Sequence, residues 1–248
     1  MKIQIDTHTH STASGHAYST IDDLARGARR RRLKGFVLTD HGPALPGGTH
    51  PYHFSNLRIL PNTIGGVLFF RGVEANIINI EGHLDLTPVY LRKLDFVMAG
   101  LHEACFKSLD REGNTRLLVT VLSNPFVDGL SHPGNPSFPI DIEEVVKAAV
   151  QYGKTLEINN SSFRVRPGSE KNCLETARLC KKHGALMSCG SDAHYWEDVG
   201  NFTKALALLD EAKVPPELVI NSSLERFRAF SGGRRAVRNA EEEKLRIL

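Results

Sequence analysis

The sequence is poor in the features that mark secreted, membrane-spanning and nucleic-acid-binding chains. Its four cysteines show no paired short spacing, so neither a disulfide framework nor a thiolate zinc site is expected. No apolar run approaches the roughly 20 residues that a membrane helix needs, and the amino terminus has no apolar leader core. The net charge of +3 is too small to attract nucleic acid by its field alone. We therefore expect a cytoplasmic protein with reduced thiols and no membrane partner.

The remaining composition is that of an ordinary globular domain. Hydrophobic residues make up 41% of the chain and charged residues 24%, which is enough for a substantial core. A length of 248 residues suits one α/β barrel, a fold that typically takes about 250 residues.

Seven apolar, strand-like runs each end in residues that can bind a metal or a substrate. Their ends carry, in order, His8 with His10, His41, Glu74, His102, His132, Asn159 with Asn160, and Asp192 with His194. The intervals from His8 to Asp192 are 33, 33, 28, 30, 27 and 33 residues, the length of one strand-helix unit. A closed parallel barrel brings all these ends to its C-terminal rim, where the chemistry of such barrels lies.

Helical patterns lie between these runs and support parallel βαβ units. Clear helices are predicted at about residues 20–33, 141–153, 171–183 and 202–212, and weaker ones at 54–60 and 114–123. A weaker eighth unit would consist of a strand at 218–221 and a helix at 224–230. We expect residues 43–53 to form a mobile loop over the rim. The predicted domains are a barrel at 1–231 and a C-terminal tail or partner helix at 232–248.

Eleven histidines are many for this length, and seven of them fall at or just past the predicted strand ends. A single histidine is more often an ordinary surface or core residue than a ligand, and we interpret His50, His53, His83 and His183 in that way. The joint placement of the others with two carboxylates is hard to explain by accident. The predicted metal ligands are His8, His10, His16, His41, Glu74, His102, His132, Asp192 and His194.

The donor types narrow the choice of metal. Imidazole with some carboxylate suits zinc, which we favour, and also iron or manganese. Nine donors exceed what one ion uses, so two or three ions are expected. If Glu74 bridges two ions, the side chains offer about ten bonds, whereas three four-coordinate ions need about twelve. The shortfall leaves positions for water or substrate, as in a catalytic site.

Several short stretches resemble the four motifs of the PHP (polymerase and histidinol phosphatase) superfamily. They are His8-x-His10, Thr39-Asp40-His41, Gly72-Val73-Glu74, the single His102 and His132, and Gly190-Ser191-Asp192-Ala193-His194. Together with the stretch 157–162, they are most similar to the small stand-alone bacterial PHP phosphatases of the YcdX type, over residues 1 to about 230. The resemblance implies a distorted (β/α)7 TIM-like barrel with a trinuclear metal centre at its C-terminal rim.

The resemblance also implies how the ligands divide among three ions. One ion would be held by His8, His10, Glu74 and Asp192. A second would be held by His16, His41 and His194, and the third by Glu74, His102 and His132.

Three divalent ions with two carboxylates leave a centre of about +4, which favours a phosphate ester over a neutral substrate. Metal-bound hydroxide bridging two ions would attack phosphorus in line. Glu74, Asp192 and His194 are the predicted catalytic residues. We expect Asp6 and Asp40 to orient ligand imidazoles. The candidate substrate contacts are Asn160, Arg164 and Arg166, since loop arginines can grip phosphate.

The sequence thus predicts a metal-dependent phosphatase that hydrolyses monoesters of a phosphorylated small molecule. A PHP-type exonuclease acting on short oligonucleotides is one alternative, because the modest charge argues only against a long polynucleotide track. A metal-storage or sensing protein without enzymatic activity is another. The sequence leaves open whether the chain forms a homo-oligomer.

Overall fold

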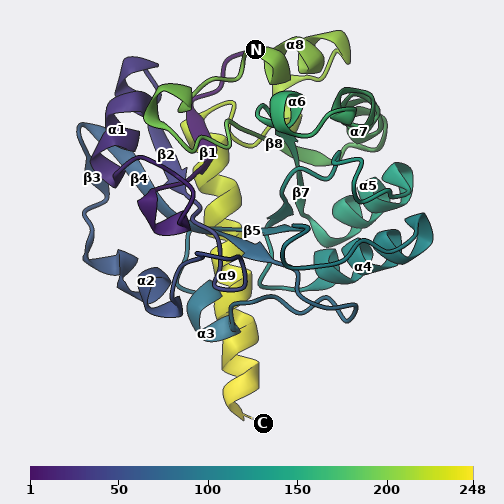
Figure 1. Ribbon diagram of the computed structural model, residues 1–248, viewed down its shortest axis with the longest axis horizontal. Coiled ribbons are helices and arrows are strands. Elements are labelled where there is room, and N and C mark those ends of the chain that lie inside the picture. Colours follow the sequence, from purple (N-terminus) through teal and green to yellow (C-terminus); the bar gives the residue numbers. More distant parts are fainter. Residues whose placement is uncertain (248) are drawn as a thin grey trace.

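A parallel sheet curled into a barrel forms the centre of the fold (Figure 1). The computed structural model describes residues 1–247, with side chains through residue 243. Within these residues the sheet order is β1-β2-β4-β5-β6-β7-β8. The strands are β1 (Ile5–Thr9), β2 (Gly35–Leu38), β4 (Val67–Asn76), β5 (Phe96–Gly100), β6 (Gly129–Leu130), β7 (Thr155–Asn159) and β8 (Leu186–Gly190). A short β3 (Thr63–Ile64) pairs antiparallel with β4.

The barrel closes where β8 returns to β1. At the rim, the N–H of Asp192 donates to the carbonyl of His8 and the N–H of His10 donates to that of Ala193, both at 2.9 Å. Deeper in the seam, the Asn221 side chain bridges the strands, because its Nδ2 donates to the carbonyls of Ile5 and Cys189, both at 2.7 Å. The expected α/β TIM-like barrel is confirmed.

The longer helices cover the outside of the barrel and match the predicted ranges closely. They are α1 (Ile21–Arg30), α4 (Arg111–Ser123), α5 (Ile142–Tyr152), α7 (Ser169–His183) and α8 (Thr203–Glu211). Thr20 and Asp23 form a capping box at the start of α1. Asp110 caps α4 by accepting from Gly113 N at 2.7 Å, so this helix begins three residues before the predicted start. The main apolar core fills the layer between strands and helices.

The eighth unit differs from its prediction. The predicted strand at 218–221 is wrong: a 3-10 turn at Pro216–Leu218 is followed by one isolated bridge, between Val219 and Met187. The reason is local, since Pro215 and Pro216 remove backbone donors. Single backbone bonds follow, from Ile220 N to Met187 and from Gln4 N to Asn221. The Asn221 side chain adds its own bonds to Ile5 and Cys189.

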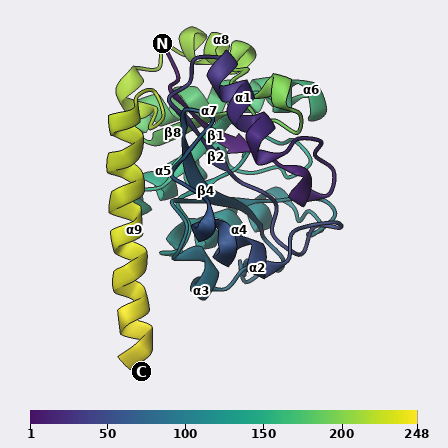
Figure 2. The ribbon, with the colours of Figure 1, turned by 90° about the vertical axis from the view of Figure 1, so that its left-hand side faces the viewer.

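The final helix, α9 (Leu224–Ile247), closes the base of the barrel. Phe227 and Phe230 pack in a second apolar cluster with Ile5 and Phe96, which lie at the amino ends of their strands. Figure 1 and Figure 2 together show α9 lying across this base, with its C-terminal end extending past the barrel. The helix runs through residue 232 without a break, so nothing in the backbone marks the predicted domain boundary, which stays a prediction.

A buried charge cluster joins α9 to the barrel base. The Arg238 guanidinium is fully buried, contacts the Asp128 carboxylate and donates to the carbonyl of Leu94 at 2.7 Å. Arg234 adds a bond to the same carboxylate at 3.1 Å. Burial lowers the pKa of the nearby Lys154 to about 7, with Arg234 adding to the effect.

The rim loop at 43–53 is tied to its surroundings. Thr49 N donates to the carbonyl of His41 at 3.3 Å, Thr49 Oγ1 donates to that of Ala13 at 3.0 Å, and Ala44 N donates to Asp85 at 2.9 Å. Its last three residues begin helix α2 (Pro51–Asn56). Among residues 1–247, we find no helix with the length and apolar character that crossing a membrane requires.

Candidate metal centre

Glu74 lies at the middle of the predicted ligands, and each of its carboxylate oxygens faces two imidazoles. Oε1 lies 2.7 Å from Nε2 of His132 and 3.3 Å from Nε2 of His102. Oε2 lies 3.1 Å from Nε2 of His8 and 3.1 Å from Nδ1 of His41. The side chain is buried near the end of β4. This is the arrangement expected of a carboxylate shared between cations.

The ends of β1 and β8 supply a second part of the cluster. Nε2 of His8 and Nε2 of His10 lie 3.0 Å apart. Asp192 Oδ1 lies 3.3 Å from the His10 nitrogen and 3.5 Å from that of His8. On the exposed side, Nε2 of His194 and Nε2 of His16 are 2.9 Å apart. All nine predicted ligands are therefore brought to one rim.

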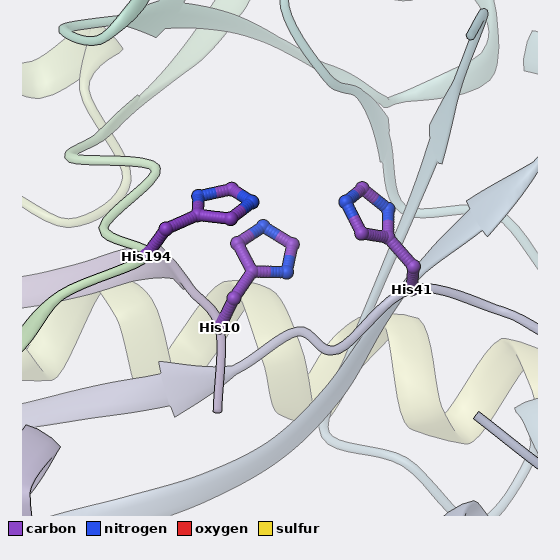
Figure 3. A group of neighbouring side chains, drawn as sticks. All are labelled: His10, His41 and His194. Carbon is purple, nitrogen blue, oxygen red and sulfur yellow. The ribbon is translucent and has the colours of Figure 1, made fainter. Parts of the chain in front are cut away.

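His10, His41 and His194 present ring nitrogens toward a common space (Figure 3). The ring centroid of His10 lies 4.4 Å from that of His41 and 4.3 Å from that of His194. Three overlapping groups have donor atoms within 4.8 Å of one another. They are His10 with His41 and His194, His8 with His10 and Glu74, and His41 with Glu74 and His102.

The donor set fits divalent cations. Nδ1 of His41 and Nε2 of His102 are buried and, although they lie near Glu74, make no hydrogen bond among the described residues. Leaving such nitrogens unpaired is costly unless a further group occupies the space. Pairs of facing imidazole nitrogens near carboxylates are what a cation such as zinc, iron or manganese bonds to. No thiol takes part in these groups.

Burial sets the protonation of these histidines. It lowers the pKa of His10 and of His132 to about 4, so both rings are neutral and able to act as ligands at neutral pH. His8 differs: burial opposes its charged form, but Glu157 and then Glu74 outweigh that effect and raise its pKa well above the ordinary value.

Glu157, on β7, is a site residue to which the sequence analysis assigned no role. Its Oε1 lies 2.8 Å from Nδ1 of His8, and its Oε2 accepts from the N–H of His132 at 2.9 Å. A Cβ at Gly190 would lie 2.1 Å from Oε1, so the neighbouring strand leaves room for this carboxylate only as glycine. The sequence did carry a signal for this residue. Side chains alternate along a strand, so Glu157 lies on the same face of β7 as Asn159, which was predicted at the rim.

Two ligand positions have left-handed backbone. The φ of His132 is 33° and that of Asp192 is 55°, a region that costs a non-glycine residue about 1–2 kcal/mol. The Glu157 bond to His132 N helps to hold the first of them. Such conformations persist where the surroundings fix them, commonly at functional sites.

Asp40 is connected to a ligand imidazole through one serine. Its Oδ1 accepts from Ser14 Oγ at 2.7 Å, and this hydroxyl lies 3.1 Å from Nδ1 of His10. The carboxylate can therefore orient the His10 ring only through Ser14.

Asp6 is placed differently from its predicted role. It accepts from backbone N–H groups, at 3.3 Å from His8, 3.0 Å from Ser191 and 2.8 Å from Gly200. It therefore ties strand ends together and does not orient a ring. Burial raises its pKa to about 6.

Of the three candidate substrate contacts, Arg166 is the one that contacts a predicted metal ligand. Its Nη1 is 3.2 Å from Oδ2 of Asp192 and 3.2 Å from Oγ of Ser162. Arg166 and His102 also line an adjoining cavity of about 350 Å³. Arg164 is exposed and lies 3.4 Å from Asp198.

The third candidate, Asn160, faces a helix start. Its side-chain oxygen accepts from the N–H groups of Lys204 and Ala205 at 3.0 and 3.1 Å. It therefore binds the first turn of α8 and is not directed at the metal cluster.

Comparison with known proteins places this chain among bacterial phosphatases. It is 51% identical over 227 residues to a probable phosphatase of Acetivibrio thermocellus, covering 92% of this chain and 94% of that protein. It is 50% identical over 232 residues to one from Caldanaerobacter subterraneus, covering 93% and 91%. A Shewanella oneidensis probable phosphatase is 46% identical over 224 residues, covering 90% and 89%. No protein-family model matches the sequence.

Among solved structures, the fold is similar to a histidinol phosphate phosphatase from Lactococcus lactis, complexed with zinc, L-histidinol and phosphate. The TM-score is 0.64 at 19% identity, covering 87% of this chain and 95% of that one. The relatives confirm the phosphatase expected from the sequence. The chain therefore belongs to this bacterial family of probable phosphatases, hydrolases that act on phosphoric ester bonds.

Proposed function

We propose that this protein is a metal-dependent phosphomonoesterase of the YcdX type, acting on a phosphorylated small molecule at a centre of three divalent ions, with zinc foremost. One observation carries the proposal: Glu74 lies within 3.3 Å of four imidazole nitrogens from four different strand ends. A buried carboxylate inside a ring of imidazoles is an arrangement suited to binding cations.

The nine predicted ligands would hold the ions, with Glu74 shared among them. When bound, the ions supply an acidified water as nucleophile and positive charge for the phosphoryl oxygens. Glu157 holds His8 in one orientation through Nδ1, so the lone pair of Nε2 faces the other donors. The nine predicted ligands meet at the rim of the barrel. One side of the cluster, where His16 and His194 are partly exposed, is open to substrate.

Arg166 is the residue best placed to bind the substrate phosphate. Its guanidinium is mostly buried and is held by Asp192 and Ser162 at the edge of the cluster. Guanidinium groups bind phosphate oxygens in bidentate fashion. The adjoining cavity beside His102 would receive the organic part of the ester.

Turnover of three model substrates tests this function. We expect release of phosphate from p-nitrophenyl phosphate and no hydrolysis of bis-p-nitrophenyl phosphate or trimming of a short oligonucleotide. Oligonucleotide trimming without monoester hydrolysis would favour an exonuclease. Silence on all three by protein with bound metal would favour storage or sensing. A screen of phosphorylated metabolites, with metal content measured in parallel, would then identify the substrate.

A further inference from the structure

A line of polar contacts runs from the rim loop to a ligand imidazole. Nε2 of His53, on α2, lies 3.2 Å from Oδ2 of Asp40. Asp40 Oδ1 accepts from Ser14 Oγ at 2.7 Å, and Ser14 Oγ lies 3.1 Å from Nδ1 of His10. Asp40 and Ser14 are fully buried. The line joins an element outside the barrel to the interior of the cluster.

The direction of the hydrogen bonds follows from donor counting. A carboxylate can only accept, so the single hydroxyl proton of Ser14 is committed to Asp40. Ser14 Oγ must then accept from its other neighbours, which are His41 N at 3.2 Å and Nδ1 of His10. The His10 proton therefore sits on Nδ1, and the lone pair of Nε2 is free for a metal.

Asp40 fixes this pattern only while its own carboxylate is held in place. Ser11 occupies both oxygens, through its N–H to Oδ1 and its hydroxyl to Oδ2, each at 2.8 Å. The remaining contact of Oδ2 is His53, whose Nε2 atom is buried. This nitrogen makes no hydrogen bond among the described residues, and Asp40 Oδ2, at 3.2 Å, is the acceptor within its reach.

We propose that His53 is a positioning residue for the metal centre, acting through Asp40 and Ser14 to hold His10 as the tautomer with a proton on Nδ1. The position of the rim loop and α2 thereby affects which nitrogen of His10 is free to bind a metal. The proposal rests on the proposed function only in that His10 is a metal ligand.

The first test reads the tautomer in metal-free protein. Nitrogen-15 NMR of the imidazoles should show the His10 proton on Nδ1. In His53→Ala the signals should move toward a mixture of tautomers, and zinc affinity measured by chelator competition should weaken about 10-fold. His53→Gln places an amide donor near Asp40 and should restore the affinity to within about 3-fold of the original. Neither readout depends on phosphatase activity.

Two further variants separate positioning from general loosening of the loop. His50 accepts from Tyr52 N at the start of α2 and does not contact Asp40, so His50→Ala disturbs the helix alone and should leave the His10 tautomer unchanged. In an Asp40→Asn background, His53→Ala should have no additional effect on zinc affinity.

Three results would overturn the proposal. They are an unchanged His10 spectrum and zinc affinity in His53→Ala, an equal effect from His50→Ala, or full additivity of His53→Ala with Asp40→Asn. Inactivity of the wild-type protein on every phosphate ester, with these readouts as expected, would instead reject the proposed function and leave the positioning role standing.

Discussion

Glu74 is the residue on which the metal centre depends most. Its two oxygens face imidazoles from β1 and from the segments that follow β2, β5 and β6. Glu74→Ala should therefore abolish activity and lower the metal content, whereas Asp40→Asn should cost about 10- to 100-fold because it acts from behind a ligand. Initial rates and elemental analysis of both variants check this. Near-normal turnover with full metal occupancy in Glu74→Ala would show that the carboxylate is not shared between ions.

Glu157 should matter for metal affinity although it lies behind the cluster. It bonds Nδ1 of His8 and the backbone of His132. Glu157→Gln keeps the volume but removes the charge, so we expect metal affinity to fall about 10- to 100-fold. Chelator competition measures the affinity, with the exposed Glu170→Gln as a control that should not change it. Equal affinities in the two variants would contradict the assigned contact.

At the scale of residues, the sequence predicted the metal-binding side chains at the strand ends. It predicted less well the residues that support those ligands from behind. Strand period and length place the donors at one rim, and the structure brings them together. Glu157 was not assigned because it lies within a strand, where only packing against Gly190 reveals that its carboxylate reaches His8. The role of Asp6 differs because a loop at Gly200, distant in sequence, supplies one of its donors.

At the scale of elements, we expect helix α9 to stabilise the folded protein through its contacts with the barrel base. Arg238→Ala would leave Asp128 buried with one partner fewer, and breaking such a pair typically costs about 3–5 kcal/mol. Urea unfolding should show this loss, while KM of the metal-loaded protein stays unchanged because the centre lies at the other end of the strands. The neighbouring Arg235→Ala is a matched control, since its exposed pair with Asp95 should contribute less than about 1 kcal/mol. Equal stability of the two variants would show that α9 does not fasten the base.

The elements also show which features the periodicity of the sequence could not predict. Helices with clear caps, such as α1 with its Thr20 capping box, lie close to their predicted positions. The segment 218–221 is apolar like a strand, yet Asn221 uses its side chain to join β1 and β8. The course of α9 past Gly232 depends on burial of Arg238 against Asp128, a contact 110 residues apart in sequence that no local pattern encodes.

At the scale of the whole molecule, the metal-free protein should be sensitive to acid. Burial lowers the pKa of His10 and His132 to about 4 from 6.5, so between these values the unfolded chain binds protons that the folded chain does not. The stability that these rings contribute is present above about pH 6.5 and is lost as pH falls toward 4. Urea midpoints of the metal-free protein at pH 7.0, 5.5 and 4.5 should therefore fall, although the raised pKa values of His8 and Asp6 act in the opposite direction. A His10→Gln and His132→Gln double variant should show a flatter dependence, and an equally steep one would reject this cause.

The central claim is that the rim cluster is a metal centre on which phosphomonoester hydrolysis depends. The most direct measurement is a titration of chelator-treated protein with zinc, recording bound zinc and release of phosphate from p-nitrophenyl phosphate in the same samples. We predict no turnover without metal, activity that rises with bound zinc toward about three ions per chain, and loss of both as pH falls below about 6. Undiminished turnover by the metal-free protein, or saturation of activity with no zinc bound at the cluster, would contradict the account.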